Sequence, residues 1–323
     1  MIISKTPYRL PLSGGGTDNK FYYSKKGSEF ISASINEYVY VLLSHRKIDN
    51  NFLIQTTSSQ FSISLNEIDH DLIRETLKYF KISEKLHIGT YSTVPTRTGL
   101  GTSSAMVVGL INCINKFKNL KLTKKKVYEI AYKIERNICK IQGGWQDQIV
   151  SSFGGALHVR ITRKGKIFIK KFKYLNNLKK IVNNNFILVY TNTKRDSSDI
   201  IKSQLNNKNN IIKFYDQIKL LNKKMEVFVK DNNIEKIGRL FLNHWNIKKK
   251  LSNKITDVVL ESFYKKLENS ISFFGSKLIG AGGGGFFLIC VKNKKKIIQI
   301  LKKKKMNFLD LKFESKGSII LNL

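Results

Sequence analysis

The feature that most constrains this chain is a glycine- and hydroxyl-rich loop that leads directly into a long apolar segment. Residues 94–116 read V-P-T-R-T-G-L-G-T-S-S-A-M-V-V-G-L-I-N-C-I-N-K, and the apolar part contains no proline. This pattern predicts a helix over residues 102–119 with its N-terminus in the loop. Gly99 and Gly101 allow the backbone to turn with positive φ and to approach an anion closely. Hydroxyl and backbone N–H groups at a helix start are typical of a phosphate-binding site.

Two alternatives to this interpretation are specific enough to compare. The phosphate loop of Walker-type nucleotide-binding proteins requires Gly-Lys followed by Ser or Thr, and residues 95–104 contain no lysine. The Walker class is therefore excluded. The interpretation as an ordinary helix N-cap remains possible, because Thr and Ser before an apolar helix are also good capping residues.

Length and composition predict a soluble globular protein with two domains. A chain of 323 residues, 41% of them hydrophobic, can bury a large core. No apolar run approaches the roughly 20 residues that cross a bilayer, and no signal-peptide pattern follows Met1. We therefore expect a cytoplasmic protein that does not enter a membrane. The cysteines lack the spacing of metal sites or disulfide frameworks, so we expect reduced core residues at Cys113, Cys139 and Cys290.

The net charge of +35 is large enough to attract nucleic acid. The basic residues are spread over the whole chain, however, and no basic helix with interleaved aromatic residues stands out. Lysine, asparagine and isoleucine are all abundant and all have A/T-rich codons, so a biased genome explains the charge. We therefore expect no nucleic-acid partner.

The spacing of apolar residues alternates between that of strands and that of helices. Strands are predicted over residues 2–12, 30–44, 87–93, 186–191, 277–280, 286–291 and 318–323, with a hairpin over 156–172. Helices are predicted over 71–80, 102–119, 124–139 and 294–304, with helical turns over 147–153 and a largely helical region over 197–268. Strands and helices follow one another without a regular β–α repeat, which predicts the α+β class.

A second glycine motif lies near the N-terminus, where a predicted strand runs into G-G-G-T-D at residues 14–18. Three consecutive glycines cost conformational entropy, so they predict that the backbone closely approaches another group. A ligand is the simplest such group. A β-turn with Asp18 as a cap is an equally good interpretation of this motif considered alone.

A third motif combines carboxylates with glycine pairs. Glu135 lies in a predicted helix, and Gly143-Gly144 is followed three residues later by Asp147. A carboxylate held beside glycine turns can act as a general base toward a substrate hydroxyl, and a helix-borne glutamate can complete a Mg²⁺ shell. An N-cap aspartate and a surface pair of Glu135 with Arg136 are the structural alternatives.

A fourth motif is the glycine run G-A-G-G-G-G of residues 280–285, which lies between two predicted strands. The run is longer than a turn requires. It predicts that another loop or a phosphate approaches the backbone here, with a flexible hinge as the alternative.

These four motifs, in this order and over nearly the whole chain, resemble those of the GHMP kinases, which include galactokinase and the homoserine, mevalonate and phosphomevalonate kinases. The resemblance implies ATP and Mg²⁺ as cofactors. It also implies an N-terminal mixed α/β domain over residues 1–180, which carries the ATP loop. A C-terminal ferredoxin-like α+β domain, with the glycine run, is implied over residues 181–323.

The resemblance further implies a role for each motif residue. Asp147 matches the catalytic base and Arg9 the basic residue paired with it, while Ser103 and Glu135 match Mg²⁺ ligands. The implied ATP-binding residues are Pro95, Gly99, Leu100, Gly101, Thr102, Ser103, Ser104, Gly282 and Gly283. The implied substrate-binding residues are Gly14, Gly15, Gly16, Thr17, Asp18 and Gly144.

The expected substrate is a phosphorylated sugar. Galactokinases carry Glu-His where this chain has Gly15-Gly16, so galactose is not expected, and the lost side chains predict space beside the sugar. Lys194 and Arg195 are candidates for binding a substrate phosphate, because they follow a predicted strand and precede a predicted helix N-terminus.

Within the family, three segments resemble kinases of D-glycero-D-manno-heptose 7-phosphate: residues 14–18, residues 99–105, and residues 191–197 together with His244-Trp245. Residues 145–148 are also similar to L-fucokinases. Both kinds of enzyme phosphorylate the anomeric hydroxyl. The resemblance thus implies transfer of the γ-phosphoryl group of ATP to the C1 hydroxyl of the heptose 7-phosphate, with L-fucose as the alternative acceptor. A homodimer is compatible with this reading, and a basic nucleic-acid-binding protein on the same fold is the alternative from another class.

Overall fold

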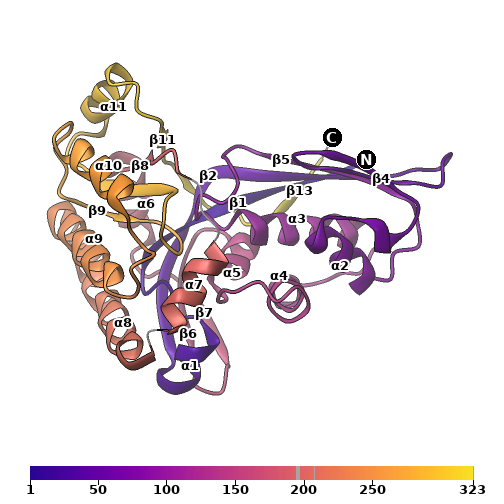
Figure 1. The fold of residues 1–323 in the computed structure, drawn as a ribbon, viewed down its shortest axis with the longest axis horizontal. Coiled ribbons are helices and arrows are strands. Elements are labelled where there is room, and N and C mark those ends of the chain that lie inside the picture. The colour runs from indigo at the N-terminus through magenta and orange to yellow at the C-terminus, as the bar shows by residue number, and fades with distance from the viewer. Residues whose placement is uncertain (194–196, 207, 323) are drawn as a thin grey trace.

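The computed structural model describes residues 1–193, 197–206 and 208–322, and Figure 1 shows two sheets with helices packed against them. The strands of the larger sheet are β1 (Ile2–Ser13), β2 (Ser28–His45), β3 (Phe52–Gln55), β4 (Ser59–Ser62), β5 (Leu86–Ser92), β6 (Ala156–Ile161), β7 (Ile167–Lys171), β12 (Phe313–Glu314) and β13 (Ile319–Leu321). Their main order is β13-β1-β2-β5-β3-β4, while β6 and β12 pair with β2, and β7 pairs with β6.

The long antiparallel pair of β1 and β2 organises this sheet. One part of β2 pairs with β5 and another part with β6. The register of β1 against β2 shifts between Pro7 and Arg9 and again between Pro11 and Ser13. Proline donates no N–H to a strand ladder, and such irregularities redirect the neighbouring side chains. Arg9, a predicted catalytic residue, therefore lies on a stretch of β1 where the regular pairing is interrupted on both sides.

Helices cover one face of the larger sheet (Figure 1): α2 (Asp71–Tyr79), α3 (Thr102–Phe117), α4 (Lys124–Tyr132) and α5 (Gln146–Phe153). The helix α3 is predominantly apolar, and Ser104–Ile111 is buried. Gly109 allows α3 to pack closely on β1, since a Cβ atom there would lie 2.8 Å from Ser4 Oγ and 2.9 Å from Thr6 Oγ1. This contact places the middle of α3 directly on β1.

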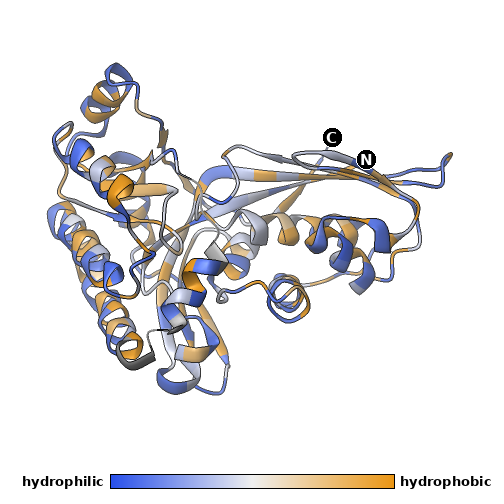
Figure 2. Ribbon diagram, viewed as in Figure 1, coloured by the Kyte–Doolittle hydropathy of each residue, from blue (hydrophilic) through white to orange (hydrophobic). Residues whose placement is uncertain are grey.

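The smaller sheet is antiparallel and comprises β8 (Phe186–Tyr190), β9 (Gly275–Leu278), β10 (Phe286–Cys290) and β11 (Phe308–Asp310), in the order β11-β8-β10-β9. The helix α9 (Ile234–Lys249) packs on β9 and β10, and α8 (Lys208–Lys230) contacts α9, β1 and β2. Hydrophilic and hydrophobic residues alternate along both helices, as expected for helices with one face on the protein (Figure 2). The helix α8 thus links the two sheets.

The remaining elements are short or lie at the edges: α1 (Lys20–Lys26), the 3₁₀ turn Leu65–Glu67, α6 (Leu175–Asn185), α7 (Ser197–Asn206), α10 (Val258–Glu268) and α11 (Lys294–Lys303). Cys113 and Cys290 are buried and Cys139 is half-buried, and all three are free thiols. Within the described ranges, no helix has the length and apolar character that crossing a bilayer requires.

The predicted α+β class is confirmed, and each predicted strand and helix has a counterpart within a few residues. One prediction is wrong in detail: the helix expected over residues 124–139 becomes a π-helix at Lys133–Ile138. The division at residue 180 stays a prediction. It falls inside α6, and the last strands, β12 and β13, return to pair with β2 and β1 of the larger sheet.

Substitution of Gly238 should destabilise the protein, because α9 lies against the start of β9 there. A Cβ atom at Gly238 would lie 2.7 Å from the carbonyl carbon of Phe274. We expect Gly238→Ala to lower the free energy of unfolding by about 1–3 kcal/mol, as is usual for overpacking. Urea unfolding would measure this change. The matched control is Gly89→Ala in β5, where the nearest atom is an ordinary 3.7 Å away; equal midpoints for the two variants would contradict the prediction.

Candidate active site

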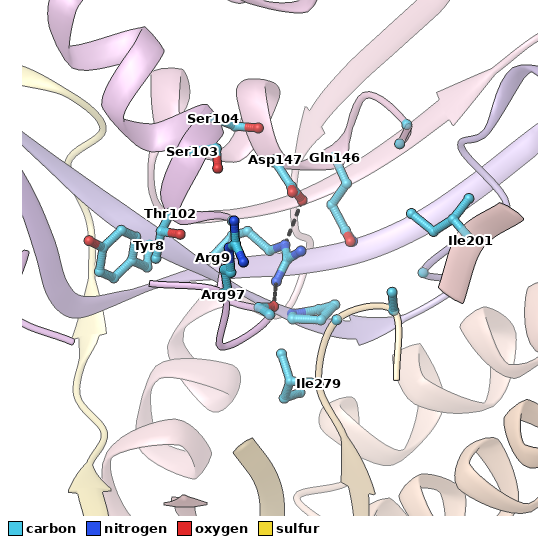
Figure 3. A pocket seen from close by; sticks show the side chains of 18 of the residues that line it. Tyr8, Arg9, Arg97, Thr102, Ser103, Ser104, Gln146, Asp147, Ile201 and Ile279 are labelled. Atoms are coloured by element: carbon cyan, nitrogen blue, oxygen red, sulfur yellow. Dashed lines mark hydrogen bonds and ion pairs between the residues drawn. The ribbon is translucent and has the colours of Figure 1, made fainter. Parts of the chain in front are cut away.

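A cleft of about 820 Å³ is lined by residues from both sheets and their loops. Figure 3 shows part of it: Arg9 comes from β1, Ser103 from α3 and Asp147 from α5. Ile201 of α7 and Ile279, just after β9, line it from the second half of the chain. The cleft therefore brings together segments that lie more than 100 residues apart in the sequence.

Arg9 and Asp147 form an ion pair within this cleft (Figure 3). Arg9 Nε donates to Asp147 Oδ1 at 2.7 Å, and Arg9 Nη1 donates to the carbonyl of Gly99. The two side chains are 8% and 21% exposed, so the pair is shielded without being closed off. Asp147 also lies in the first turn of α5, where the helix dipole favours a negative charge. The arrangement holds an oriented carboxylate at the cleft surface.

The loop before α3 passes directly beside this carboxylate. A Cβ atom at Gly101 would lie 3.2 Å from the carboxyl carbon of Asp147, and Gly101 has a φ of +78°. Both the space and the dihedral angle favour glycine here. The candidate base and the candidate phosphate loop are thus immediate neighbours.

Asp18 is buried beside Asp147 and is held by backbone groups. Its Oδ2 accepts the N–H of Gln146 at 2.8 Å, and its Oδ1 accepts the N–H of Gly16 at 3.2 Å. Gly144 packs so closely on Asp18 that a Cβ atom at Gly144 would overlap the carboxylate. Burial raises the pKa of Asp18, partly offset by the N–H of Gln146, and the charge of Asp147 raises it further. An acceptor hydroxyl could therefore meet two carboxyl groups, Asp18 and Asp147.

Glu135 is a second buried carboxyl group, carried by the π-helix Lys133–Ile138. Its Oε2 accepts from Gln148 Nε2, which also donates to Ser104 Oγ at 3.1 Å. Its Oε1 is buried without a hydrogen-bond partner within the described residues. Burial raises the pKa of Glu135, and Arg136 opposes this effect. Single π-helical turns are frequent at functional sites.

The residues predicted as Mg²⁺ ligands fit a hard cation. Glu135 lines the cleft, and its Oε1 accepts no hydrogen bond from the described residues but lies 3.9 Å from Arg136 Nη1. Ser103 is exposed at the start of α3. Mg²⁺ prefers oxygen ligands and keeps several waters or substrate phosphates, so two protein ligands suffice. Within the described part of the chain, no group of three or more His, Cys, Asp or Glu side chains could hold a metal unaided.

The glycine run of residues 280–285 packs against the loop before α3. A Cβ atom at Gly99 would lie 2.7 Å from the carbonyl oxygen of Ile279, and one at Gly280 would lie 2.6 Å from Gly99 Cα. Both residues have positive φ angles. Of the interpretations offered by the sequence, the close approach of another loop is the one observed. Contact of this run with a phosphate stays a prediction.

Most predicted site residues line the cleft: Arg9, Gly15, Gly16, Asp18, Pro95, Gly99, Gly101, Thr102, Ser103, Ser104, Glu135, Gly144, Asp147 and Gly282. Gly14, Thr17, Leu100 and Gly283 are not among the lining residues. The Thr17 hydroxyl instead donates to the Gly14 carbonyl at 2.7 Å, which stabilises the turn. Lys194 and Arg195 lie outside the described residues.

The sequence predicted empty space beside both Gly15 and Gly16, but the structure has it only beside Gly15. A Cβ atom at Gly16 would lie 2.5 Å from the Tyr215 ring, whereas at Gly15 the nearest atoms are 3.7 Å away. The prediction is wrong at Gly16 because α8 brings Tyr215 into that position. The Tyr215 hydroxyl donates to Gln204 at 3.0 Å, and Gln204 donates to the Ala281 carbonyl at 3.0 Å.

Several lining residues were not found from the sequence: Arg97, Gln204, Tyr215, Lys248 and Lys277. Arg97 lies within the phosphate loop and has a positive φ of +61°, which is uncommon for a non-glycine residue. Its position in the loop was the available signal. The two lysines could not be selected among 58 Lys and Arg residues without the tertiary structure.

The fold and the cleft together define a class of protein. An oriented carboxylate paired with arginine lies between a helix N-terminus suited to phosphates and a second carboxyl group suited to hydroxyls. These are the parts required for phosphoryl transfer to an alcohol, which depends mainly on positioning and charge stabilisation.

Comparisons with known proteins agree with this class. A family model described as the GHMP kinases N terminal domain matches residues 70–155. The chain is 30% identical over 301 residues to a D-glycero-alpha-D-manno-heptose 7-phosphate kinase of Campylobacter jejuni, covering 87% of this chain and 86% of the relative. The chain therefore belongs to the GHMP kinase family, whose members are phosphotransferases.

Solved structures share the fold over the whole chain. A D-glycero-D-manno-heptose 1-phosphate kinase from Bacteroides thetaiotaomicron superposes with a TM-score of 0.80 at 22% identity, covering 100% of this chain and 99% of that one. A galactokinase from Lactococcus lactis complexed with galactose gives a TM-score of 0.73 at 15% identity, with 99% and 95% covered.

The buried Glu135 should destabilise the free protein at neutral pH. Since burial raises its pKa, ionising it costs more in the folded than in the unfolded chain. This cost is absent well below the ordinary glutamate pKa of about 4.3, where the carboxyl is protonated in both states. It grows as the pH rises from that value to the raised pKa and is constant at higher pH. We expect Glu135→Gln to raise the Tm at neutral pH, by an amount that shrinks on acidification.

Thermal unfolding at several pH values would check this expectation. The matched control is Glu129→Gln on α4, whose side chain is 37% exposed and lies 4.0 Å from Lys125. Exposed charges of this kind contribute little. A Tm difference for Glu135→Gln that stays constant with pH, or that has the opposite sign, would show that ionisation of Glu135 does not destabilise the fold.

Proposed function

We propose that this protein transfers the γ-phosphoryl group of ATP to the anomeric C1 hydroxyl of D-glycero-D-manno-heptose 7-phosphate. The observation that carries the proposal is the Arg9–Asp147 pair, which lies between the loop of residues 99–104 and the buried Asp18. The acceptor is inferred from the relatives, because both the C. jejuni and the B. thetaiotaomicron protein are named as heptose phosphate kinases. Those two names place the heptose phosphate differently, at position 7 and at position 1.

Asp147 acts as the general base in this mechanism. Its carboxylate accepts the proton of the acceptor hydroxyl as the oxygen attacks the γ-phosphorus, while the bond from this phosphorus to the bridging oxygen of the β-phosphate breaks and ADP leaves. Arg9 fixes the orientation of the carboxylate through the bond of 2.7 Å. Asp18, which is held by the N–H of Gln146, orients the neighbouring sugar hydroxyls.

The loop before α3 binds the nucleotide phosphates in this proposal. Backbone N–H groups at the start of α3 and its helix dipole attract anions. Arg97, from the same loop, adds a cation at the edge of the cleft. When bound by Ser103 and Glu135, Mg²⁺ would neutralise charge on the phosphates during transfer.

An L-fucokinase activity is the second candidate, because residues 145–148 are similar to those of L-fucokinases. A relative from Bacteroides fragilis named L-fucokinase/L-fucose-1-P guanylyltransferase is 23% identical to this chain over 192 residues. A panel of ATP-consumption assays with heptose 7-phosphate, unphosphorylated heptose, L-fucose and galactose would separate the candidates. Preference for a neutral sugar would contradict the heptose 7-phosphate proposal.

Replacement of the proposed base should remove turnover while preserving nucleotide binding. We expect Asp147→Asn to lower kcat by about 10²- to 10⁴-fold, because an amide cannot accept the proton. The Kd for ATP, measured by calorimetry, should stay within about threefold, since Asp147 contributes only to the reacting end of the nucleotide. Asp49→Asn, in a half-buried pair with Arg46 that does not line the cleft, is the control. A kcat near that of the wild type would remove Asp147 from the mechanism.

Replacement of either proposed metal ligand should change the Mg²⁺ dependence of the activity. We expect Ser103→Ala and Glu135→Gln each to raise the Mg²⁺ concentration for half-maximal rate by about tenfold or more. Glu129→Gln again serves as control. Titration curves that superimpose on that of the wild type would exclude both residues as ligands.

A further inference from the structure

Three basic side chains line the cleft without an acidic partner within the described residues. His244 and Lys248 lie one turn apart on α9, and Lys277 lies on β9. Their exposed fractions are 6%, 6% and 2%. Residues so deeply buried are rarely charged unless they are paired.

Backbone carbonyls, rather than charges, anchor the two lysines. Lys248 Nζ donates to the carbonyls of Leu278, at 3.1 Å, and Gly280. Lys277 Nζ donates to the Leu12 carbonyl at 2.7 Å. In the charged form each ammonium has three donors, so these bonds leave one donor on Lys248 and two on Lys277 without an oxygen or nitrogen acceptor in the described part of the chain. The Phe241 ring, with its centroid 4.9 Å from Lys277 Nζ, is a weaker cation–π partner.

His244 completes this basic cluster as a neutral ring with one N–H donor, because burial, followed by repulsion from Lys277 and Lys248, lowers its pKa well below the ordinary value. Both of its ring nitrogens are buried without a hydrogen-bond partner among the residues that the structure describes. Buried polar atoms are nearly always hydrogen-bonded, so each exception requires an explanation. An anion bound between His244 and the lysines would supply acceptors to all three side chains at once.

The electrostatics of the cluster agree with such a ligand. Burial, followed by repulsion from Arg9, lowers the pKa of Lys248 to about 7. Burial and repulsion from Lys248 lower the pKa of Lys277 well below its ordinary value. A dianion at this place would favour the charged form of both lysines.

We propose that His244, Lys248 and Lys277 form the subsite for a phosphate group that the acceptor already carries. This inference rests on the proposed function, in which the acceptor is a sugar phosphate. A phosphate monoester carries close to two negative charges and three acceptor oxygens, which match the unfilled donors of the cluster.

The position of Lys277 favours the acceptor over the nucleotide as the source of the phosphate, whereas Lys248 binds Gly280, which packs on Gly99 of the nucleotide loop. Lys277 binds the carbonyl of Leu12, which lies two residues before the glycine motif of residues 14–18. That motif leads to Asp18, the residue proposed to bind sugar hydroxyls. The nucleotide phosphates are assigned to the loop before α3, beside Gly101 and Asp147.

Steady-state kinetics of Lys277→Met and Lys248→Met test the proposal. With saturating ATP, kcat/KM is measured for heptose 7-phosphate and for the unphosphorylated heptose. We expect the ratio of the two values to fall by about ten- to hundred-fold in each variant, as for loss of a charged hydrogen bond. The KM for ATP should change by less than about threefold. Methionine keeps the length of the lysine side chain, and melting curves would establish that each variant is folded.

The matched control is Lys219→Met on α8. Lys219 Nζ also donates to two backbone carbonyls, those of Lys26 at 2.7 Å and Gly27 at 3.2 Å, but it does not line the cleft. This control should leave the ratio unchanged. Equal losses on both sugars, or a rise in the ATP KM alone, would overturn the proposal. If the ratio of kcat/KM for the phosphorylated to the unphosphorylated heptose falls in Arg195→Ala but in neither lysine variant, the phosphate binds at Arg195 instead.

A binding measurement separates failure of this inference from failure of the proposed function. Inorganic phosphate is titrated against protein saturated with a non-hydrolysable ATP analogue, and the shift in Tm is recorded. We expect stabilisation of the wild type and of Lys219→Met, and its loss in Lys277→Met. If heptose 7-phosphate is not a substrate but this pattern holds, the anion subsite stands while the named acceptor is wrong. Equal stabilisation of all variants would overturn the subsite itself.

Discussion

The Arg9 side chain joins three parts of the chain that are distant in sequence, and the geometry of the cleft depends on it. One guanidinium nitrogen binds Asp147 of α5 and another binds the carbonyl of Gly99 in the loop before α3. Gly99 in turn lies in backbone contact with Gly280, beyond β9 of the smaller sheet. Since Arg9 is itself placed by the interrupted pairing of β1 with β2, a local irregularity in one strand sets the relation between base, phosphate loop and second sheet.

The cleft concentrates charges whose burial opposes folding. Burial raises the pKa of Asp18 and Glu135 and lowers that of Lys248 and Lys277, so all four charged forms are disfavoured in the free protein. Stability alone would favour apolar side chains at such positions. These residues therefore lower the stability of the free protein. Such a cost is expected where residues are selected for binding ions and phosphates rather than for packing.

Much of the fold, and many of the residues that line the candidate site, could be predicted from the sequence, because the motifs are local. Gly101 and the hydroxyl residues after it specify a loop and a helix start within a few positions, and Asp147 follows its glycine pair at a fixed distance. Tyr215, Lys248 and Lys277 could not be predicted, because only the docking of α8, α9 and β9 brings them to the cleft. The π-helix that carries Glu135 was not predicted either, because the spacing of its apolar residues is that of an ordinary α-helix.

The same docking bears on the acceptor proposed for this cleft. The glycines at positions 15 and 16 suggested that room for a larger sugar distinguishes this chain, yet Tyr215 occupies the position beside Gly16 and only Gly15 leaves space. The space beside Gly15 and Gly16 therefore explains little of the proposed preference for a phosphorylated sugar. Two lysines with unfilled donors, in contrast, favour a dianion and leave a neutral sugar with buried groups that it cannot satisfy. Charge, more than volume, is the property by which this cleft should discriminate between a sugar and its phosphate.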